Sequence, residues 1–203
     1  AFMYGWPFIE YLKQINESGI ILQFSCLPYI DKNFSQRCLK KAKIRFKSII
    51  NSSAENVFIG LTWDSKNLVD ENGKNYFDKN FELRKSSLNL LISEIEKRQK
   101  NVILIGPVLT PNYDFASEYS RQIIFNGNKH EIKEKRKNFD ANYEDIINYY
   151  EKKMGNNFIQ PHKELCDVEN CNFADKSGAL FSDDSHLSEY GSMKVLPLFN
   201  QIK

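Results

Sequence analysis

The sequence contains no long apolar run and no marked excess of charge of one sign. None of its apolar stretches reaches the roughly 18 residues that a helix needs to cross a bilayer, and the chain does not open with the charged and apolar segments of a signal peptide. Its 28 Lys and Arg residues nearly balance its 26 Asp and Glu residues, which leaves a net charge of +2. So even a balance is not typical of nucleic-acid binding, and we expect no nucleic-acid partner.

Motifs for common cofactors are absent as well. The sequence has no glycine-rich phosphate-binding loop and no dinucleotide fingerprint, so we expect no cofactor. The densest charged run, "NKHEIKEKRKN" at 128–138, mixes both signs, and we interpret it as a solvated surface that includes His130. His162 follows a proline in "FIQPHKEL", and we expect it to be structural rather than a ligand of a metal or a substrate.

The chain does have enough apolar material for one folded domain. Of its 203 residues, 41% are apolar and 13% aromatic, so we expect a single domain over residues 1–203. Three short apolar runs, "IILQFS" (20–25), "NVFIGLTW" (56–63) and "NVILIGPVL" (101–109), are typical of strands buried on both faces of a parallel sheet. The polar stretch 66–80 between the second and third runs is predicted to be a surface loop.

Helical periodicity separates these runs. Apolar residues recur at helical spacing over 35–50, 81–98 and 142–154. Alternating strands and helices predict an α/β fold, in which helices cover both faces of a parallel sheet. The opening residues 1–19 predict a further helix, with Pro7 in its first turn. Because an α/β chain of this kind usually starts with a strand, we expect the first strand to lie upstream of this sequence.

The four cysteines form two local pairs in the sequence, Cys26 with Cys38 and Cys166 with Cys171. Two disulfides fit this spacing and would require an oxidising compartment. The loop closed by Cys26 and Cys38 would stabilise the fold by about 3 kcal/mol in the chain-entropy model. Four free thiols are an alternative. A zinc site is another, although neither pair has the Cys-x-x-Cys spacing common in structural zinc sites.

An acid, a hydroxyl and an imidazole crowd together in "FSDDSHLSEYG" at 181–191, in a turn before a predicted helix that starts near Ser188. Adjacent side chains generally diverge, so Ser185 is poorly placed to use the neighbouring His186 as its base. Asp183 lies three residues from His186, and in a tight turn its carboxylate can reach the ring, fix the tautomer and leave the other nitrogen for a nucleophile from elsewhere. The plain alternative is an acidic turn at a helix entrance, favoured by the helix dipole.

The block D-x-x-H-L-S-x-x-G at 183–191 resembles the last block of the SGNH hydrolase superfamily. The longer pattern "C-x4-C … G-A-L-F-S-D-D-S-H-L-S-x-x-G" over 166–191 resembles the SGNH domain at the C-terminus of bacterial acyltransferase-3 membrane proteins. The similarity extends in order to "CLPYIDKNFSQRC" (26–38), "VFIGLTW" and "VILIGPV". This resemblance implies a flavodoxin-like, three-layer α/β sandwich around a central parallel sheet.

The resemblance also implies site residues, and here the sequence departs from the family. A Gly-Asp-Ser-His-like block should carry the nucleophile before the first helix, but none is present, and Ala1 lies about where such a block should end. The nucleophile is therefore either upstream or truly missing. No Gly-x-Asn-Asp block supplies oxyanion donors; Trp63 is a candidate pocket residue, with packing in the core as its alternative. The family interpretation of Cys166 and Cys171 is a disulfide that braces the segment before the turn.

The function implied by the resemblance is transfer of an acetyl or other short acyl group to a glycan such as lipopolysaccharide, through a serine ester. His186 would act as general base and acid, and Asp183 would orient it. A membrane-embedded acyltransferase-3 domain, in the same polypeptide, would be the partner and would tether the domain at the periplasmic or extracellular face. The alternatives are an SGNH carbohydrate esterase and a catalytically inactive glycan-binding domain. Specificity for the acceptor is expected in the loops 64–80 and 110–140.

Overall fold

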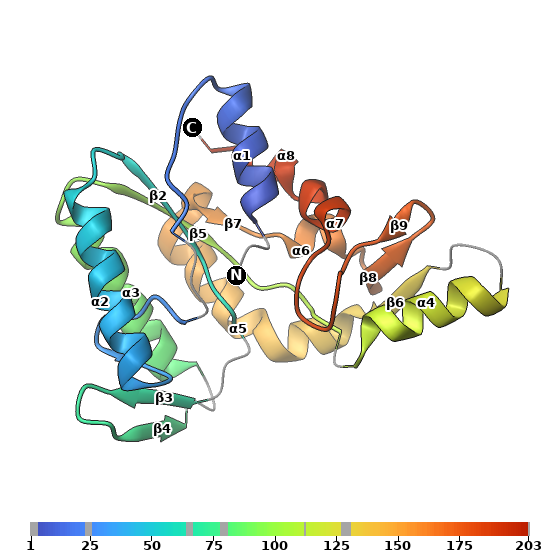
Figure 1. Ribbon diagram of the computed structural model, residues 1–203, viewed down its shortest axis with the longest axis horizontal. Helices are drawn as coiled ribbons and strands as arrows, with labels where there is room; N and C mark the ends of the chain where they lie inside the picture. The colour runs from blue at the N-terminus through green and yellow to red at the C-terminus, as the bar shows by residue number, and fades with distance from the viewer. Residues whose placement is uncertain are drawn as a thin grey trace. The chain divides into compact units, whose positions relative to one another are not determined.

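The computed structural model of the chain (Figure 1) describes residues 4–22, 26–63, 67–77, 81–111, 113–126 and 131–202. It divides into two compact units. The central unit spans 22–105, and the terminal unit combines 1–21 with 106–203. Each unit is described by itself below, and the single domain expected from chain length stays a prediction.

Two helices and two parallel strands carry the core of the central unit. Strand β2 (Asn56–Gly60) pairs with β5 (Asn101–Ile105) in parallel register, from Asn56 opposite Asn101 to Gly60 opposite Ile105. Helix α2 (Gln36–Asn51) and helix α3 (Glu82–Glu96) flank this pair in sequence, and α3 packs against β5. The predicted helices and the parallel pairing are present, so the α/β class is confirmed, although both strands end earlier than the apolar runs that predicted them.

The predicted surface loop at 66–80 is partly wrong. Strand β3 (Asn67–Asp70) and strand β4 (Asn75–Phe77) form an antiparallel hairpin, and β1 (Lys32–Asn33) pairs with β3. The carboxylate of Asp70 accepts hydrogen bonds from the backbone N–H groups of Asn72 and Lys74, each at 2.9 Å, and so closes the turn. Strands of four and three residues are too short to show a period-two apolar alternation, which is why the sequence pattern missed them.

The strand predicted at 20–25 is not formed in the part that the structure describes. Residues 20–22 have no regular secondary structure, Ile20 is 75% exposed, and 23–25 lie outside the described residues. A strand needs a neighbour for its backbone N–H and C=O groups, and no described strand pairs with residues 20–22. Apolar composition alone was therefore not enough to predict a strand at residues 20–22.

The terminal unit contains a small antiparallel sheet and several helices. Strand β8 (Asn170–Asp175) pairs with β6 (Ile132–Lys135) on one side and with β9 (Gly178–Ala179) on the other. The helices of this unit, in chain order, are α1 (Gly5–Gln14), α4 (Phe115–Asn126), α5 (Arg136–Met154), the 3-10 turn η1 (Gly155–Asn157), α6 (His162–Leu165), α7 (Glu189–Lys194) and α8 (Leu196–Phe199), with the short strand β7 (Phe158–Ile159) after η1. Figure 1 shows α1 beside α7 and α8, which it contacts.

Two predicted helices of this unit differ from the structure in length. Helix α5 begins at Arg136, six residues before the periodic segment, and Arg136 forms an ion pair with Asp140 one turn later. The opening helix is shorter than 1–19: α1 ends at Gln14, and Asn16 then adopts a positive φ of 55°. None of the described helices is both long and apolar enough to cross a membrane.

Candidate active site

The segment between β9 and α7 forms a narrow loop that is closed at its base by backbone hydrogen bonds. The N–H of Leu180 donates to the carbonyl of Phe173 in β8, and the N–H of Ser188 donates to the carbonyl of Leu180, both at 2.9 Å. Phe181 and Leu187 form an antiparallel bridge and are both buried. The buried Phe181 and Leu187 therefore anchor the loop, and the polar residues between these two extend toward solvent.

Helix α7 is seated tightly on this loop. The hydroxyl of Ser188, the N-cap, accepts from the N–H of Gly191 at 2.9 Å and donates to the carbonyl of Ala179 at 2.6 Å. A Cβ atom at position 191 would lie 1.9 Å from the carbonyl oxygen of Leu180. Only glycine allows this approach, so the S-x-x-G part of the sequence block has a packing role.

Asp183 and His186 lie together at the tip of the loop. The Nδ1 atom of His186 lies 2.9 Å and 3.1 Å from the two carboxylate oxygens of Asp183. The same carboxylate accepts from the backbone N–H groups of Ser185 at 2.8 Å and of His186 at 2.7 Å. One side chain thus fixes both the ring and the turn. The structure brings the predicted pair into contact, and its catalytic role stays a prediction.

The pair has the arrangement of a base with its orienting acid. Partial burial raises the pKa of Asp183. Hydrogen bonds from the Ser185 backbone and from the ring and backbone of His186 lower this pKa by a larger amount, so the net change is a decrease. Asp183 is therefore a carboxylate at neutral pH. With Nδ1 bound, Nε2 is the nitrogen left to take a proton, and it forms no hydrogen bond within the described chain. The His186 side chain is 47% exposed.

The Ser185 hydroxyl lies near Nδ1 of His186, not near Nε2. The hydroxyl is 3.3 Å from Nδ1 of His186, so these two adjacent side chains do not diverge as expected. The contact nevertheless falls on the nitrogen that Asp183 already holds, and the hydroxyl also contacts the carboxylates of Asp183 at 3.3 Å and Asp184 at 3.0 Å. A serine activated by Nε2 must come from elsewhere.

Trp63 belongs to the core of the central unit. It is 5% exposed, and its indole N–H donates at 3.1 Å to the carbonyl of Ile105, the last residue of β5. This geometry favours the packing alternative for Trp63. A role in a substrate pocket stays a prediction.

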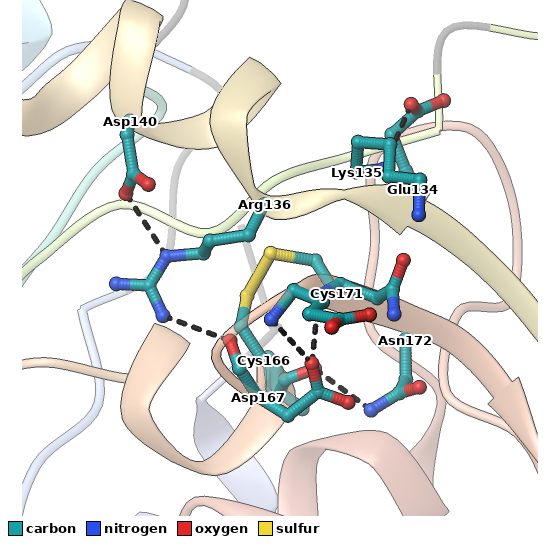
Figure 2. The surroundings of a disulfide bond; sticks show 11 residues. Glu134, Lys135, Arg136, Asp140, Cys166, Asp167, Cys171 and Asn172 are labelled. Carbon is teal, nitrogen blue, oxygen red and sulfur yellow. Dashed lines mark hydrogen bonds and ion pairs between the residues drawn. A yellow bond between two sulfur atoms is a disulfide. The ribbon is translucent and has the colours of Figure 1, made fainter.

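All four cysteines form disulfides in the predicted pairing, Cys26 with Cys38 and Cys166 with Cys171. The zinc and free-thiol alternatives are therefore wrong. Among the described residues no cluster of His, Cys, Asp and Glu side chains could hold a metal ion. Figure 2 shows the second disulfide where α6 meets β8; nearby, the Arg136 guanidinium bridges the Asp140 carboxylate at 2.9 Å and the Asp167 carbonyl at 3.2 Å. The disulfide closes the connection that leads into β8, and Phe173 of β8 accepts the backbone hydrogen bond from Leu180.

The remaining histidines were predicted to be structural or exposed. His162 is 4% exposed and its ring packs 4.8 Å from that of Phe139. Burial, together with the charges of Arg136 and Lys163, lowers the pKa of His162 to about 4, so the ring is neutral at pH 7. His130 lies outside the described residues.

One supporting group was missed by sequence reasoning. The Asp175 carboxylate at the end of β8 accepts from the hydroxyl of Tyr190 at 2.7 Å and pairs with Lys194 at 3.3 Å. Tyr190 and Lys194 lie one turn apart on α7, so Asp175 fastens that helix to the β8–β9 hairpin. The spacing of Tyr190 and Lys194 was the only available signal, and it does not indicate a partner 15 residues upstream of Tyr190.

Comparison with known proteins gives three results. The family model described as "SGNH domain (fused to AT3 domains)" matches residues 1–201. The solved structure of the periplasmic domain of a lipopolysaccharide acetyltransferase from Salmonella ser. Paratyphi A superposes with a TM-score of 0.68 at 21% identity, over 98% of this chain and 77% of that one. A search of curated proteins found no match. The structural likeness shows that this chain and the Salmonella domain share a fold. The family match over nearly the whole length establishes that the chain belongs to the SGNH domains that are fused to AT3 domains.

Proposed function

We propose that this domain transfers an acetyl or other short acyl group to a hydroxyl of a cell-surface glycan, outside the cytoplasm. The observation that carries the proposal is the Asp183–His186 pair, in which Asp183 holds Nδ1 and leaves Nε2 to act as a base. The family's fusion to AT3 domains supports a membrane acyltransferase partner that delivers the acyl group. The likeness in fold to a periplasmic lipopolysaccharide acetyltransferase domain supports a glycan acceptor.

The reaction would run in two proton-coupled steps. The oxygen of a serine attacks the acyl carbonyl while its proton passes to Nε2 of His186, and the donor's leaving group departs with that proton. A glycan hydroxyl then attacks the serine ester, gives its proton to Nε2, and the serine oxygen leaves with it. Asp183 keeps the ring oriented and stabilises the imidazolium formed in each step.

We place the serine, with the first strand, upstream of residue 1. Two features support an additional strand. In the central unit β2 lies at the edge of its sheet among the described strands, so one row of its backbone groups is available for pairing. The apolar run at Ile20, Ile21 and Leu22 is exposed, although its composition suits a strand in a sheet. The alternative of an inactive glycan-binding domain would apply if no serine block precedes this sequence.

The test uses the full-length protein with p-nitrophenyl acetate as donor and a lipopolysaccharide-derived oligosaccharide as acceptor. His186→Ala should lower transfer of acetyl to the sugar by about 100-fold or more, because general acid–base catalysis contributes on that order. Ser185→Ala is the matched control: it removes the neighbouring hydroxyl, keeps the backbone N–H that Asp183 binds, and should retain activity within about three-fold.

Three outcomes oppose parts of the proposal. Loss of activity in Ser185→Ala would make that serine the nucleophile and remove the need for one upstream. Full activity in His186→Ala would remove the base. Acetate release by the wild-type protein without any sugar ester would favour the esterase alternative.

A further inference from the structure

An aromatic cluster in the terminal unit underlies the candidate active site. The rings of Phe115, Phe173 and Phe181 meet edge to face, with centroids 5.4 to 6.3 Å apart. All three side chains are at most 2% exposed. Such T-shaped contacts among buried rings give a densely packed and therefore rigid base.

The cluster is joined directly to the loop that carries the Asp183–His186 pair. Phe181 lies two residues before Asp183 and forms the buried base of the loop. Phe115 opens helix α4, and its contact with Phe181 places the start of α4 beside the loop before α7, as Figure 1 also shows. Residues just before α4 therefore lie near the buried base of this loop.

Tyr113 is an exposed residue that contacts this cluster. Its ring lies 6.4 Å from that of Phe115 and 6.5 Å from that of Phe173, while 40% of the residue remains exposed. Its hydroxyl forms no hydrogen bond with any described residue. The buried rings of Phe115 and Phe173 thus contact the Tyr113 ring. The rest of the Tyr113 side chain offers solvent an apolar surface with a hydroxyl group at its end.

The surroundings of Tyr113 suit a neutral ligand with hydroxyl groups. Partial burial, and then the negative charges of Glu118 and Glu134, raise the pKa of Tyr113, so its hydroxyl stays protonated at neutral pH. The same two carboxylates oppose an anionic group such as a phosphate at this point. A sugar ring can pack its C–H face on the aromatic ring and exchange a hydrogen bond with the phenol.

We propose that Tyr113, near the base of the loop that carries the Asp183–His186 pair, is a specificity-determining residue that binds a sugar ring of the acceptor glycan. This inference rests on the proposed acyl transfer, and it assigns part of the acceptor specificity to one side chain. Tyr113 acts by binding and orienting the acceptor, so it affects the step in which sugar competes with water for the acyl group.

The experiment compares Tyr113→Ala with two further variants in the full-length protein. With p-nitrophenyl acetate and the lipopolysaccharide-derived oligosaccharide, Tyr113→Ala should raise KM for the oligosaccharide by about three- to ten-fold, the range expected for one aromatic contact. Release of p-nitrophenol without sugar should stay unchanged. Tyr113→Phe should keep most of the affinity. Tyr149→Ala, which removes a tyrosine of similar exposure on α5, should leave KM unchanged.

A binding measurement separates this inference from the proposed function. Saturation-transfer NMR with the oligosaccharide alone needs no catalysis, and its signal should weaken in Tyr113→Ala but persist in Tyr149→Ala. An unchanged KM and an unchanged signal in Tyr113→Ala would overturn the inference, even if transfer occurs. An equal fall in the sugar-dependent and sugar-independent reactions, with a lower melting temperature, would show that Tyr113 only supports the fold. Weakened binding without transfer by the wild-type protein would remove the proposed function and leave Tyr113 in a binding site.

Discussion

A single carboxylate organises the candidate site at the scale of residues. Asp183 binds two backbone N–H groups and the His186 ring, so the side chain that would orient the base also shapes the turn that presents it. This double role explains why the spacing D-x-x-H could be interpreted from sequence: the turn and the hydrogen-bonded pair are the same local structure. The position of Ser185 could not be derived this way, because its contact with Nδ1 depends on side-chain rotation within the turn.

His162 is in the opposite situation, because its ring is buried but no described carboxylate holds its Nδ1 atom. The Nδ1 atom is buried and accepts or donates no hydrogen bond among the described residues. Arg136 and Lys163 oppose a positive charge on the ring, while Asp140 and Glu151 favour one, and burial outweighs both carboxylates. The folded chain therefore holds this imidazole neutral.

The first prediction is acid sensitivity that originates at His162. Its pKa falls from 6.5 in the unfolded chain to about 4 in the folded one, so the unfolded state binds more protons between these values. Stability from this residue is complete above pH 6.5 and is lost as the pH falls toward 4, by up to about 3 kcal/mol. Urea unfolding of the wild-type protein and His162→Phe, at pH 7, 5 and 4, should show that the wild-type protein loses up to about 3 kcal/mol more than the variant as the pH falls. Parallel curves would contradict this origin.

At the scale of elements, helices were easier to predict than strands. Helices α2 and α3 follow from apolar residues at helical spacing, and the β2–β5 pair follows from short β-branched runs, although only β5 is buried along most of its length. The β3–β4 hairpin and the β6–β8–β9 sheet did not follow, because their strands are only two to six residues long and are defined by their pairing rather than by a long apolar run. The site was accessible to sequence reasoning only where it is local; the Asp175–Tyr190 contact joins two elements and was missed.

The contact between α7 and the loop gives the second prediction. Gly191→Ala places a methyl group against the Leu180 carbonyl, where no flexible side chain can move aside. The backbone must shift, and we expect a loss of about 3 kcal/mol in the free energy of unfolding, together with loss of transfer activity as the loop is displaced. Glu189→Ala, at an exposed position of the same helix, is the control and should change stability by roughly 0.5 kcal/mol or less. Equal stabilities of the two variants in urea would show that α7 is not seated as tightly as described.

At the scale of the whole molecule, each compact unit has its own apolar core and its own disulfide. The central unit buries Leu88, Ile92 and Val102, and the terminal unit buries Phe139, Phe181 and Phe199. Cys26–Cys38 lies in the first and Cys166–Cys171 in the second. Neither disulfide joins the two units, so each restricts only the unfolded ensemble of its own part of the chain.

The third prediction follows from this separation. The disulfides close segments of 12 and 5 residues in sequence separation, and the chain-entropy model gives about 3 kcal/mol for Cys26–Cys38 and about 2 kcal/mol for Cys166–Cys171. Because they share no partner and lie in different units, the losses in Cys26→Ser/Cys38→Ser and in Cys166→Ser/Cys171→Ser should add within about 0.5 kcal/mol when all four are replaced. Urea unfolding measures the sum, and thiol titration of the unreduced, denatured wild-type protein should find no free thiol. A loss in the fourfold variant well above the sum would mean that each disulfide also supports the other unit.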